Sequence, residues 1–244
     1  MKMQIFGYGF VGRAHALAFS PDYHVYDPAL GSKDINKNAD AVIIAVSTPE
    51  GKDGACDMSN VFNAIELSPD APILIKSTIS LEGWRSIKEM FPDKNISFSP
   101  EFLRADYAME DFKNQDIVYL GGDGEEFWYD TLSEKLDVIV YIECPEALIL
   151  AKYMRNSFLA TKVAFFNQMY DMCKEYDIDY TSVVHTVSDD DRIGNSHTFI
   201  TEERGFGGHC FPKDTAAIVH SGNKSGVNLS IIEEAINYNK KIRK

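Results

Sequence analysis

The sequence predicts an α/β protein in two parts: a parallel β-sheet domain with crossover helices, followed by a smaller all-α domain with a long central helix. The first half alternates short apolar runs with helical patterns, as strands joined by crossover helices do. From Glu146 to Tyr176, about thirty residues carry apolar side chains at helical spacing without proline or glycine, which indicates one long helix. We place the boundary near Glu143 and expect domains at residues 1–143 and 144–244.

Seven short apolar runs predict the strands. They are Met3–Phe6, His24–Tyr26, Ala41–Val46, Ile73–Ile75, Ile96–Phe98, Ile117–Leu120 and Val138–Ile142. Gly31–Asn38 is short and polar, so we expect no helix after the second strand. Further helices are expected near Asp179–Val187, after Pro212 and over Ser230–Lys244. In the last of these, Ser230 followed by Glu233 is a capping-box pattern.

Composition and charge argue against several classes of function. A net charge of -13 disfavours nucleic acid and anionic membranes as partners, because their phosphates would repel the chain. No apolar run reaches the roughly 20 residues of a transmembrane helix, and the start lacks a signal-peptide layout. The six histidines are dispersed, so no metal is expected. Scattered cysteines without CxxC spacing suit a reducing cytoplasm, with neither disulfides nor zinc; they are Cys56, Cys144, Cys173 and Cys210.

A glycine loop follows the first predicted strand and precedes an alanine-rich helical pattern. Its GxGxxG spacing allows a tight turn and brings backbone close to a pyrophosphate, which the helix N-terminus then binds. Asp27 ends the second strand, where a carboxylate hydrogen-bonds the adenosine ribose and disfavours NADP. A glycine turn without a ligand is the alternative. The pattern favours a Rossmann domain that binds NAD through Gly7, Gly9, Phe10, Val11, Gly12 and Asp27.

Two more segments follow apolar strands. Val46–Pro49 contains Thr48, and Lys76–Thr78 ends on Thr78. Both are therefore expected at the carboxyl edge of the sheet, where open α/β folds bind ligands. Taken singly, each is also compatible with an ordinary turn.

The segment from Arg204 to Asp214 carries the strongest chemical signal. Three glycines precede Cys210, and Pro212 is well placed to open a helix. Cys210 would then lie at a helix N-terminus with Lys213 one turn away, and both features stabilise a thiolate. These surroundings favour a nucleophile over the alternative, a buried structural cysteine.

Further motifs are each weak alone but specific in combination. They are Ser47-Thr48-Pro49 with Gly54 and Asp57, Lys76–Ile79, Ser99–Arg104, Lys152–Ala160, Asp191–Gly194 and Gly205–Asp214. With the glycine loop, they make the chain resemble the UDP-glucose/GDP-mannose dehydrogenase family over nearly its whole length. The resemblance implies NAD-dependent oxidation of the C6 alcohol of a nucleotide sugar, UDP-glucose in the first instance, to a carboxylate. Two NAD are used per sugar, and no free aldehyde is released.

The resemblance also implies roles for single residues. Cys210 would form a thiohemiacetal and then a thioester with C6, which explains why a dehydrogenase needs a nucleophile. Lys152 and Asn156, four residues apart on the long helix, would stabilise the oxyanion. Without the resemblance, Lys152 would be interpreted as a solvated lysine and Asn156 as a packing residue.

Other implied roles concern water, cofactor and substrate. Asp214 and Thr78 would position water, and Glu101 would be the base in thioester hydrolysis. Thr48, Thr78 and Lys213 would help to hold NAD. The implied substrate contacts are Glu101, Phe102, Leu103, Arg104, Lys152, Asn156, Phe199, Ile200, Thr201, Glu202, Glu203 and Gly207.

Departures from the family pattern leave the sugar open. Ala105 and Asp106 stand where members usually carry glutamate, so Asp106 substitutes for it or that cofactor contact is lost. His209 before the cysteine resembles relatives that oxidise UDP-N-acetylhexosamines, whereas Phe211 to Asp214 favour the glucose or GDP-mannose branch.

Partners and activity also have alternatives. Relatives dimerise through the long helix, so we expect a homodimer. They also continue into a second Rossmann-like domain that completes the nucleotide pocket. For a chain ending at Lys244, a minimal form, a fragment and a separate chain supplying that domain all stay open. The alternative functions are a dimeric module that binds NAD or nucleotide sugar with little turnover and, less favoured, a two-electron β-hydroxyacid dehydrogenase.

Overall fold

The structure, a computed structural model, describes residues 1–19 and 21–244 and divides into two compact units. The first unit contains Met1–Pro49 and Cys56–Lys152, and the second contains Glu50–Ala55 and Tyr153–Lys244. The division falls inside helix α6 (Pro145–Glu175), whose first turns belong to the first unit. The assignment of domains to residues 1–143 and 144–244 stays a prediction.

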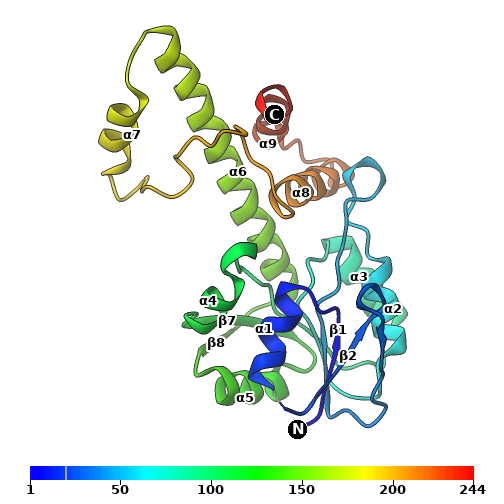
Figure 1. The fold of residues 1–244 in the computed structure, drawn as a ribbon. Helices are drawn as coiled ribbons and strands as arrows, with labels where there is room; N and C mark the ends of the chain where they lie inside the picture. The colour runs from blue at the N-terminus through cyan, green and yellow to red at the C-terminus, as the bar shows by residue number, and fades with distance from the viewer. Residues whose placement is uncertain (20) are drawn as a thin grey trace. The chain divides into compact units, whose positions relative to one another are not determined.

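The described part of the first unit forms one eight-stranded sheet, in the order β3-β2-β1-β4-β5-β6-β7-β8 (Figure 1). The strands are β1 (Met3–Phe6), β2 (Tyr23–Asp27), β3 (Ser32–Lys33), β4 (Ala41–Ile44), β5 (Ile73–Ile75), β6 (Ile96–Phe98), β7 (Ile117–Gly122) and β8 (Ile139–Ile142). All seven predicted strands are confirmed, with ends that differ by no more than about two residues. Where no helix was expected after β2, a short 3-10 helix η1 (Pro28–Leu30) and β3 follow instead.

The sheet is mostly parallel, with antiparallel pairs at β2–β3 and β6–β7. Because β7 returns alongside β6, the connection from residue 99 to residue 116 stays at the carboxyl edge of β6. This connection contains 3-10 helix η3 (Ala105–Tyr107) and α4 (Ala108–Lys113). The reversal therefore keeps Glu101–Arg104 at the edge where a ligand of this fold binds.

Helices cover both faces of the sheet. Helix α1 (Phe10–Ala18) and α5 (Glu125–Leu136) share one core cluster with β1, in which Ala16, Trp128 and Ile5 are buried. Helix α2 (Ser59–Leu67) and α3 (Leu81–Met90) lie on the opposite side (Figure 1). Coverage of both faces explains why β4 and β5 are continuous apolar runs rather than alternating ones.

The second unit is helical, which confirms the predicted α/β class followed by an all-α part. Besides α6 it contains a 3-10 helix η2 (Lys52–Gly54), α7 (Tyr180–Ser188), α8 (Phe211–Ser225) and α9 (Ser230–Ile242). Its core packs Ala160 and Ala164 of α6 against Phe206 and Ala235. Two alanines one turn apart leave room on α6 for the large Phe206 ring.

The predicted capping box at α9 is wrong. The N-cap is Leu229, and no side-chain hydrogen bond caps the helix. Ser230 is already the first helical residue, so its hydroxyl does not hold the extended position from which an N-cap side chain reaches the N–H groups ahead. Lys240 and Lys241 in the last turn suit the negative end of the helix dipole.

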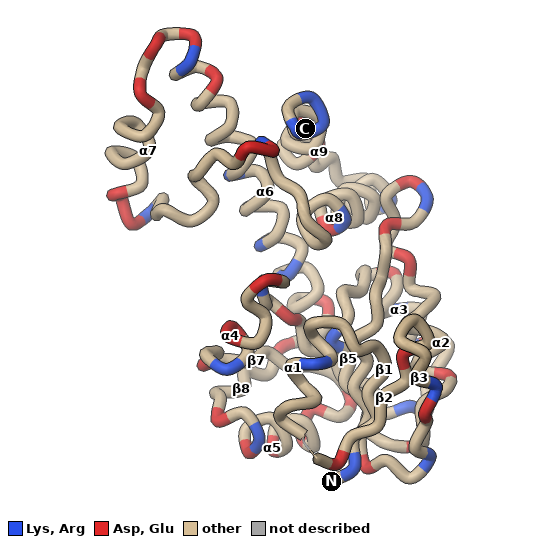
Figure 2. Tube along the Cα trace, in the orientation of Figure 1, with Lys and Arg blue, Asp and Glu red and all other residues tan. Residues whose placement is uncertain are grey.

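Charged residues are distributed along both units, with acidic and basic positions interspersed (Figure 2). The net charge of -13 is therefore not concentrated in one acidic segment. Among the described residues, no helix is both long enough and apolar enough to cross a membrane.

Candidate functional site

The glycine loop after β1 has a backbone that requires glycine at two positions. Gly7 has φ +86°, and a Cβ there would lie 2.5 Å from the Ala45 carbonyl oxygen. A Cβ on Gly12 would collide with the carbonyl oxygen of Gly7. By contrast, a Cβ on Gly9 would meet nothing within 4 Å, and no side-chain hydrogen bond caps α1 there. The first-turn N–H groups at Phe10 and Val11 are thus open towards a ligand, and the loop fits a dinucleotide pyrophosphate.

Asp27 lies beside this loop at the end of β2. Its Oδ2 accepts a hydrogen bond of 2.7 Å from Tyr8 N, and its Oδ1 accepts one of 3.1 Å from Ala29 N. The two bonds hold the carboxylate between the glycine loop and η1. This is the place from which a Rossmann carboxylate reaches the adenosine ribose.

Thr48 and Thr78 lie at the same edge of the sheet. Thr48 is buried and follows β4, while Thr78 follows the neighbouring parallel strand β5. Their two loops are joined, because Ser77 Oγ donates a hydrogen bond of 2.8 Å to the carbonyl oxygen of Val46. The structure therefore gathers both threonines at the edge that carries the glycine loop.

Glu101 is buried among basic side chains of the first unit. Its Oε2 lies 3.2 Å from Lys76 Nζ and 3.8 Å from His15 Nε2. Lys152 Nζ donates a hydrogen bond to the backbone carbonyl oxygen of Glu101. Lys76 Nζ also donates to Ser99 Oγ at 2.8 Å.

The electrostatics of this cluster favour a carboxylate. Burial alone would raise the pKa of Glu101, but the positive charges of Lys76 and Lys152 oppose it, and the net effect is a lowered pKa. Burial, reinforced by Lys76, lowers the pKa of His15 to about 4. His15 is therefore neutral at pH 7, and its contact with Glu101 is not an ion pair. The result is an ionised Glu101 held in a site screened from water.

The residues after Glu101 are placed differently from one another. The Phe102 ring lies 5.8 Å from Lys152 Nζ, in a cation–π arrangement. Arg104 is exposed, forms a bidentate pair with Asp111 and stacks over Tyr107, with 4.6 Å between guanidinium and ring centroid. Leu103 is half-buried between them. A substrate contact by Arg104 would compete with its pairing to Asp111.

Cys210 occupies the position that the sequence predicts, immediately before α8. It is the N-cap residue and is half-buried, and its carbonyl oxygen accepts a hydrogen bond of 2.8 Å from Asp214 N. The buried Asp214 carboxylate accepts a hydrogen bond of 2.6 Å from Asn156 Nδ2 and one of 2.5 Å from Lys213 Nζ. Lys213 thus neutralises Asp214 rather than standing as an isolated cation.

The Phe199–Glu203 loop is mostly exposed. Phe199 is 66% exposed, and Glu203 pairs with Arg243 of the C-terminal segment at 2.5 Å. A Cβ on Gly207 would collide with the guanidinium of Arg243. This region therefore fits against the end of α9, a contact for which the sequence offers no local signal.

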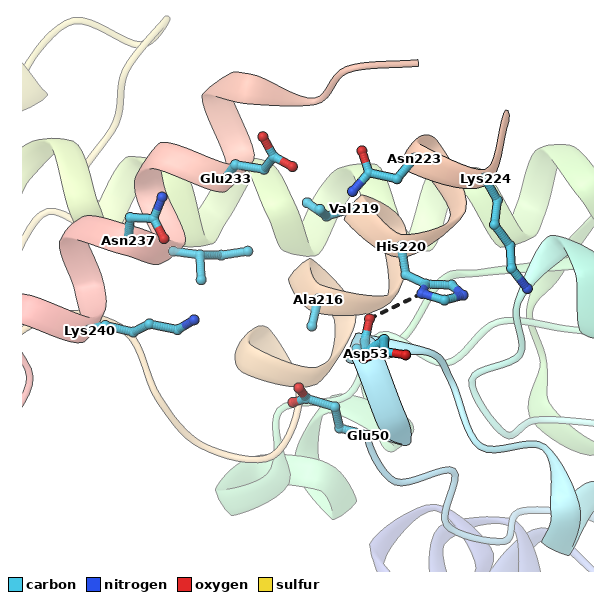
Figure 3. A pocket seen from close by; sticks show the side chains of 12 residues that line it. Glu50, Asp53, Ala216, Val219, His220, Asn223, Lys224, Glu233, Asn237 and Lys240 are labelled. Atoms are coloured by element: carbon cyan, nitrogen blue, oxygen red, sulfur yellow. Dashed lines mark hydrogen bonds between the residues drawn. The ribbon is translucent and has the colours of Figure 1, made fainter. Parts of the chain in front are cut away.

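The second unit also has a pocket of about 680 Å³, formed by α8, α9 and residues 50–54 (Figure 3). Val219 and Ala216 lie at its apolar side, while Glu50, Glu233 and Lys240 point into it from different segments (Figure 3). His220 Nδ1 lies 3.1 Å from the carbonyl oxygen of Asp53. None of its lining residues is a predicted site residue.

The predicted site residues thus fall into two groups, one in each compact unit. The first unit brings Lys152 together with Glu101 and Phe102, and the second brings Asn156 together with Asp214 and Lys213. Sequence reasoning missed His15 and Lys76, which surround Glu101; Lys76 lies inside a motif whose lysine had no role assigned. Within the described residues, no group of three or more His, Cys, Asp or Glu side chains is arranged to hold a metal ion.

The fold and the glycine loop together define the class of protein. A loop that needs glycine lies at the carboxyl end of β1, between β2 and β4, and an aspartate ends β2 beside it. This is the switch point at which Rossmann sheets bind dinucleotides. The chain is therefore of the dinucleotide-binding class, with a helical unit that carries the cysteine segment.

Comparison with known proteins identifies the family. The NAD-binding domain of the UDP-glucose/GDP-mannose dehydrogenase family matches residues 30–136, and its central domain matches residues 147–241. UDP-glucose 6-dehydrogenase of Rickettsia bellii is 34% identical over 219 residues, covering 84% of this chain and 50% of that protein. The enzyme of the same name from Rhizobium meliloti is 32% identical over 224 residues, covering 83% and 51%.

A solved structure agrees. The UDP-glucose dehydrogenase of Pyrobaculum islandicum superposes with a TM-score of 0.82 at 27% identity, covering 98% of this chain and 68% of that one. The chain belongs to the UDP-glucose/GDP-mannose dehydrogenase family and carries its NAD-binding and central domains. It spans about half the length of the curated relatives it matches.

Proposed function

We propose that this chain takes part in the NAD-dependent oxidation of the C6 alcohol of UDP-glucose to UDP-glucuronate, with Cys210 as the nucleophile. The observation that carries the proposal is the arrangement around α8. Cys210 occupies the N-cap position of the helix, and one turn further on the buried Asp214 is hydrogen-bonded to Asn156 of α6. Membership of the family supports the choice of reaction.

The reaction balances as two oxidations followed by a hydrolysis. NAD, held by the glycine loop and Asp27, would supply the oxidant for each of the two oxidations as the acceptor of a hydride from C6. The Cys210 thiolate adds to the C6 aldehyde to form a thiohemiacetal, whose oxidation leaves a thioester. Water then cleaves the C–S bond, which releases the carboxylate and returns the thiol.

The other residues have supporting roles in this scheme. Lys152 and Asn156 donate hydrogen bonds to the oxyanion that forms when the thiolate adds to the carbonyl. Asp214 and Thr78 hold the water. Glu101, kept ionised by Lys76 and Lys152, accepts a proton from that water during hydrolysis.

Cofactor and substrate contacts complete the proposal. NAD is held by the glycine loop, Asp27, Thr48, Thr78 and Lys213. The sugar nucleotide is contacted by Glu101–Arg104, by Phe199–Glu203 and by Gly207. Oxidation of GDP-mannose or a UDP-N-acetylhexosamine uses the same chemistry, and His209 is the residue that would favour the latter. We also propose a cytoplasmic location, which the scattered spacing of the four cysteines supports.

The test counts NADH per sugar with the purified chain, UDP-glucose and NAD. Two NADH per sugar are expected, with turnover abolished by Cys210→Ala. A Cys173→Ala variant controls for the loss of a thiol elsewhere in the helical unit. Turnover that persists in Cys210→Ala would contradict the covalent mechanism and favour a two-electron hydroxyacid dehydrogenase.

A second candidate is a module that binds NAD or nucleotide sugar with little turnover, and the observation that favours it is the pairing of Arg104, a predicted substrate contact, with Asp111. Calorimetric titration separates the two functions. Binding of NAD or UDP-glucose without any NADH formation supports the module. If adding the C-terminal domain of a relative restores NADH formation, the result supports a pocket completed by a separate chain.

We also propose a homodimer that forms through α6. Four large side chains of this helix are more than half exposed: Met154, Phe158, Phe165 and Met172. Their spacing of four, seven and seven residues places them along one helix face. A continuous apolar stripe on a long helix is what a partner helix covers.

A further inference from the structure

The glycine segment before Cys210 begins with two consecutive residues in the left-handed backbone region. Arg204 has φ +59° and Gly205 has φ +57°. Glycine adopts this conformation readily, but arginine does not, so surrounding contacts must hold it there. Those contacts come from two helices, α9 and α6.

From α9, Asn239 binds the segment through both ends of its amide. Its Oδ1 accepts a hydrogen bond of 2.7 Å from Phe206 N, and its Nδ2 donates one of 2.9 Å to the Phe206 carbonyl oxygen. Asn239 is only 8% exposed, so water cannot readily replace either bond. The fit is close, because a Cβ on Gly205 would collide with Asn239 Oδ1.

From α6, three residues hold the side chain of Arg204. Its Nε donates a hydrogen bond of 2.8 Å to Asn167 Oδ1, and its Nη2 donates one of 2.8 Å to Asp171 Oδ1. The guanidinium carbon lies 4.8 Å from the centroid of the Tyr170 ring. Gly205 N donates 3.2 Å to the same Asn167 Oδ1, so the backbone is bound as well.

These contacts are linked to Cys210 through a pair of aromatic rings. Phe206 is 4% exposed and packs edge-on against Phe211, with 6.5 Å between ring centroids. Phe211 is the first residue of α8 and directly follows Cys210. If the Phe206 backbone shifted, Phe211 and the start of α8 would lose their support.

We propose that Asn239 and Arg204 are positioning residues for Cys210, which hold the Gly205–Gly208 segment so that the thiol stays at the N-terminus of α8. The proposal deepens the proposed function and rests on it in taking Cys210 as the nucleophile. Neither residue touches the reacting atoms; each acts through the backbone that leads to the cysteine.

The experiment measures alkylation of each cysteine by iodoacetamide at pH 6 and pH 9, without NAD or sugar, by peptide mass spectrometry. The ratio of the two rates for one thiol reports how well its thiolate is stabilised, independently of its accessibility. The exposed Cys144 is the internal reference. In Asn239→Ala, we expect the pH 6 to pH 9 ratio of Cys210 to fall by about fivefold towards that of Cys144, the size of effect that a helix N-terminus has on a nearby anion.

Controls separate positioning from loss of fold. Asn237→Ala removes an exposed asparagine from the same helix and should leave the ratio unchanged. Asn239→Asp keeps an oxygen that can accept the hydrogen bond from Phe206 N, so the ratio of Cys210 should fall less than in Asn239→Ala. Circular dichroism checks the fold, and if Asn239→Ala does not fold, Arg204→Ala tests the same segment from the α6 side with the same expected fall.

Two contrary results are distinguishable. An unchanged Cys210 ratio in folded Asn239→Ala overturns the positioning role and leaves the proposed function intact. If Cys210 and Cys144 have the same ratio in the wild-type chain, Cys210 has no stabilised thiolate. That result contradicts both this inference and the nucleophile of the proposed function.

Discussion

Burial of the neutral His15 ring predicts a loss of stability in mild acid that can be assigned to one side chain. Its pKa in the folded chain is lowered to about 4, first by burial and then by Lys76, against 6.5 when unfolded. Between these values the unfolded chain binds more protons, so stability is present above pH 6.5 and is lost as the pH falls towards 4. At pH 5 the difference is about 1.5 pKa units, or about 2 kcal/mol at 1.36 kcal/mol per unit.

The perturbation is His15→Gln, which keeps a polar side chain of similar length but cannot titrate. Urea unfolding at pH 7.5 and pH 5.0 is followed by tryptophan fluorescence, because Trp84 and Trp128 are both buried in the unit that contains His15. The wild-type chain should lose about 2 kcal/mol more than the variant between the two pH values. The lowered pKa of Glu101 adds a loss only below about 4.5, outside this window.

His185→Gln is the control, since it removes the exposed histidine of α7, far along the chain from His15. It should retain the acid-dependent loss of the wild-type chain. The reasoning is refuted if His15→Gln loses as much stability as wild type, because His15 would then carry no proton difference between the folded and unfolded chains.

Three further predictions follow from the same geometry. Gly12→Ala should destabilise the chain by about 1–3 kcal/mol in urea unfolding, because the added Cβ collides with backbone. Gly9→Ala is the control and should leave the unfolding midpoint unchanged. Equal midpoints for the two variants would contradict the steric argument. Lys76→Met should lower the free energy of unfolding by about 3–5 kcal/mol at pH 7, because Glu101 loses the cation beside it. Part of this loss should disappear at pH 4, where Glu101 begins to be protonated. A loss that is the same at both pH values would point to packing instead. Phe158→Asp should shift the chain from dimer to monomer in sedimentation velocity, and a dimer that persists would place the interface elsewhere.

Part of this protein is readable from local patterns. The runs Met3–Phe6, Ile73–Ile75 and Ile96–Phe98 coincide with β1, β5 and β6 because strands buried on both faces are mostly apolar. Cys210 lies immediately before α8 as expected, because proline near the start of a helix and glycine ahead of it are local signals. The capping-box prediction at Ser230 was wrong although the residue pattern is present, because the helix begins at Ser230 itself and Leu229 takes the N-cap position.

Partners across the fold were not readable in this way. Nothing near Glu101 in the chain indicates that His15, Lys76 and Lys152 would surround it, and nothing near Phe206 points to Asn239. Arg104 shows the converse, since its motif suggests a ligand while its guanidinium pairs with Asp111. Which charges meet depends on how strands and helices pack, and packing brings together residues far apart in the sequence.

The sequence by itself therefore determined the order of strands and helices, the glycine loop with its aspartate and the family, because backbone sterics and hydrophobic period act over a few residues. Tertiary structure alone decided which side of the sheet carries Glu101, that His15 beside it is neutral, and that α6 and α9 hold the segment before Cys210. These outcomes depend on burial and on hydrogen bonds between distant residues, whose free energies exist only once the chain is folded.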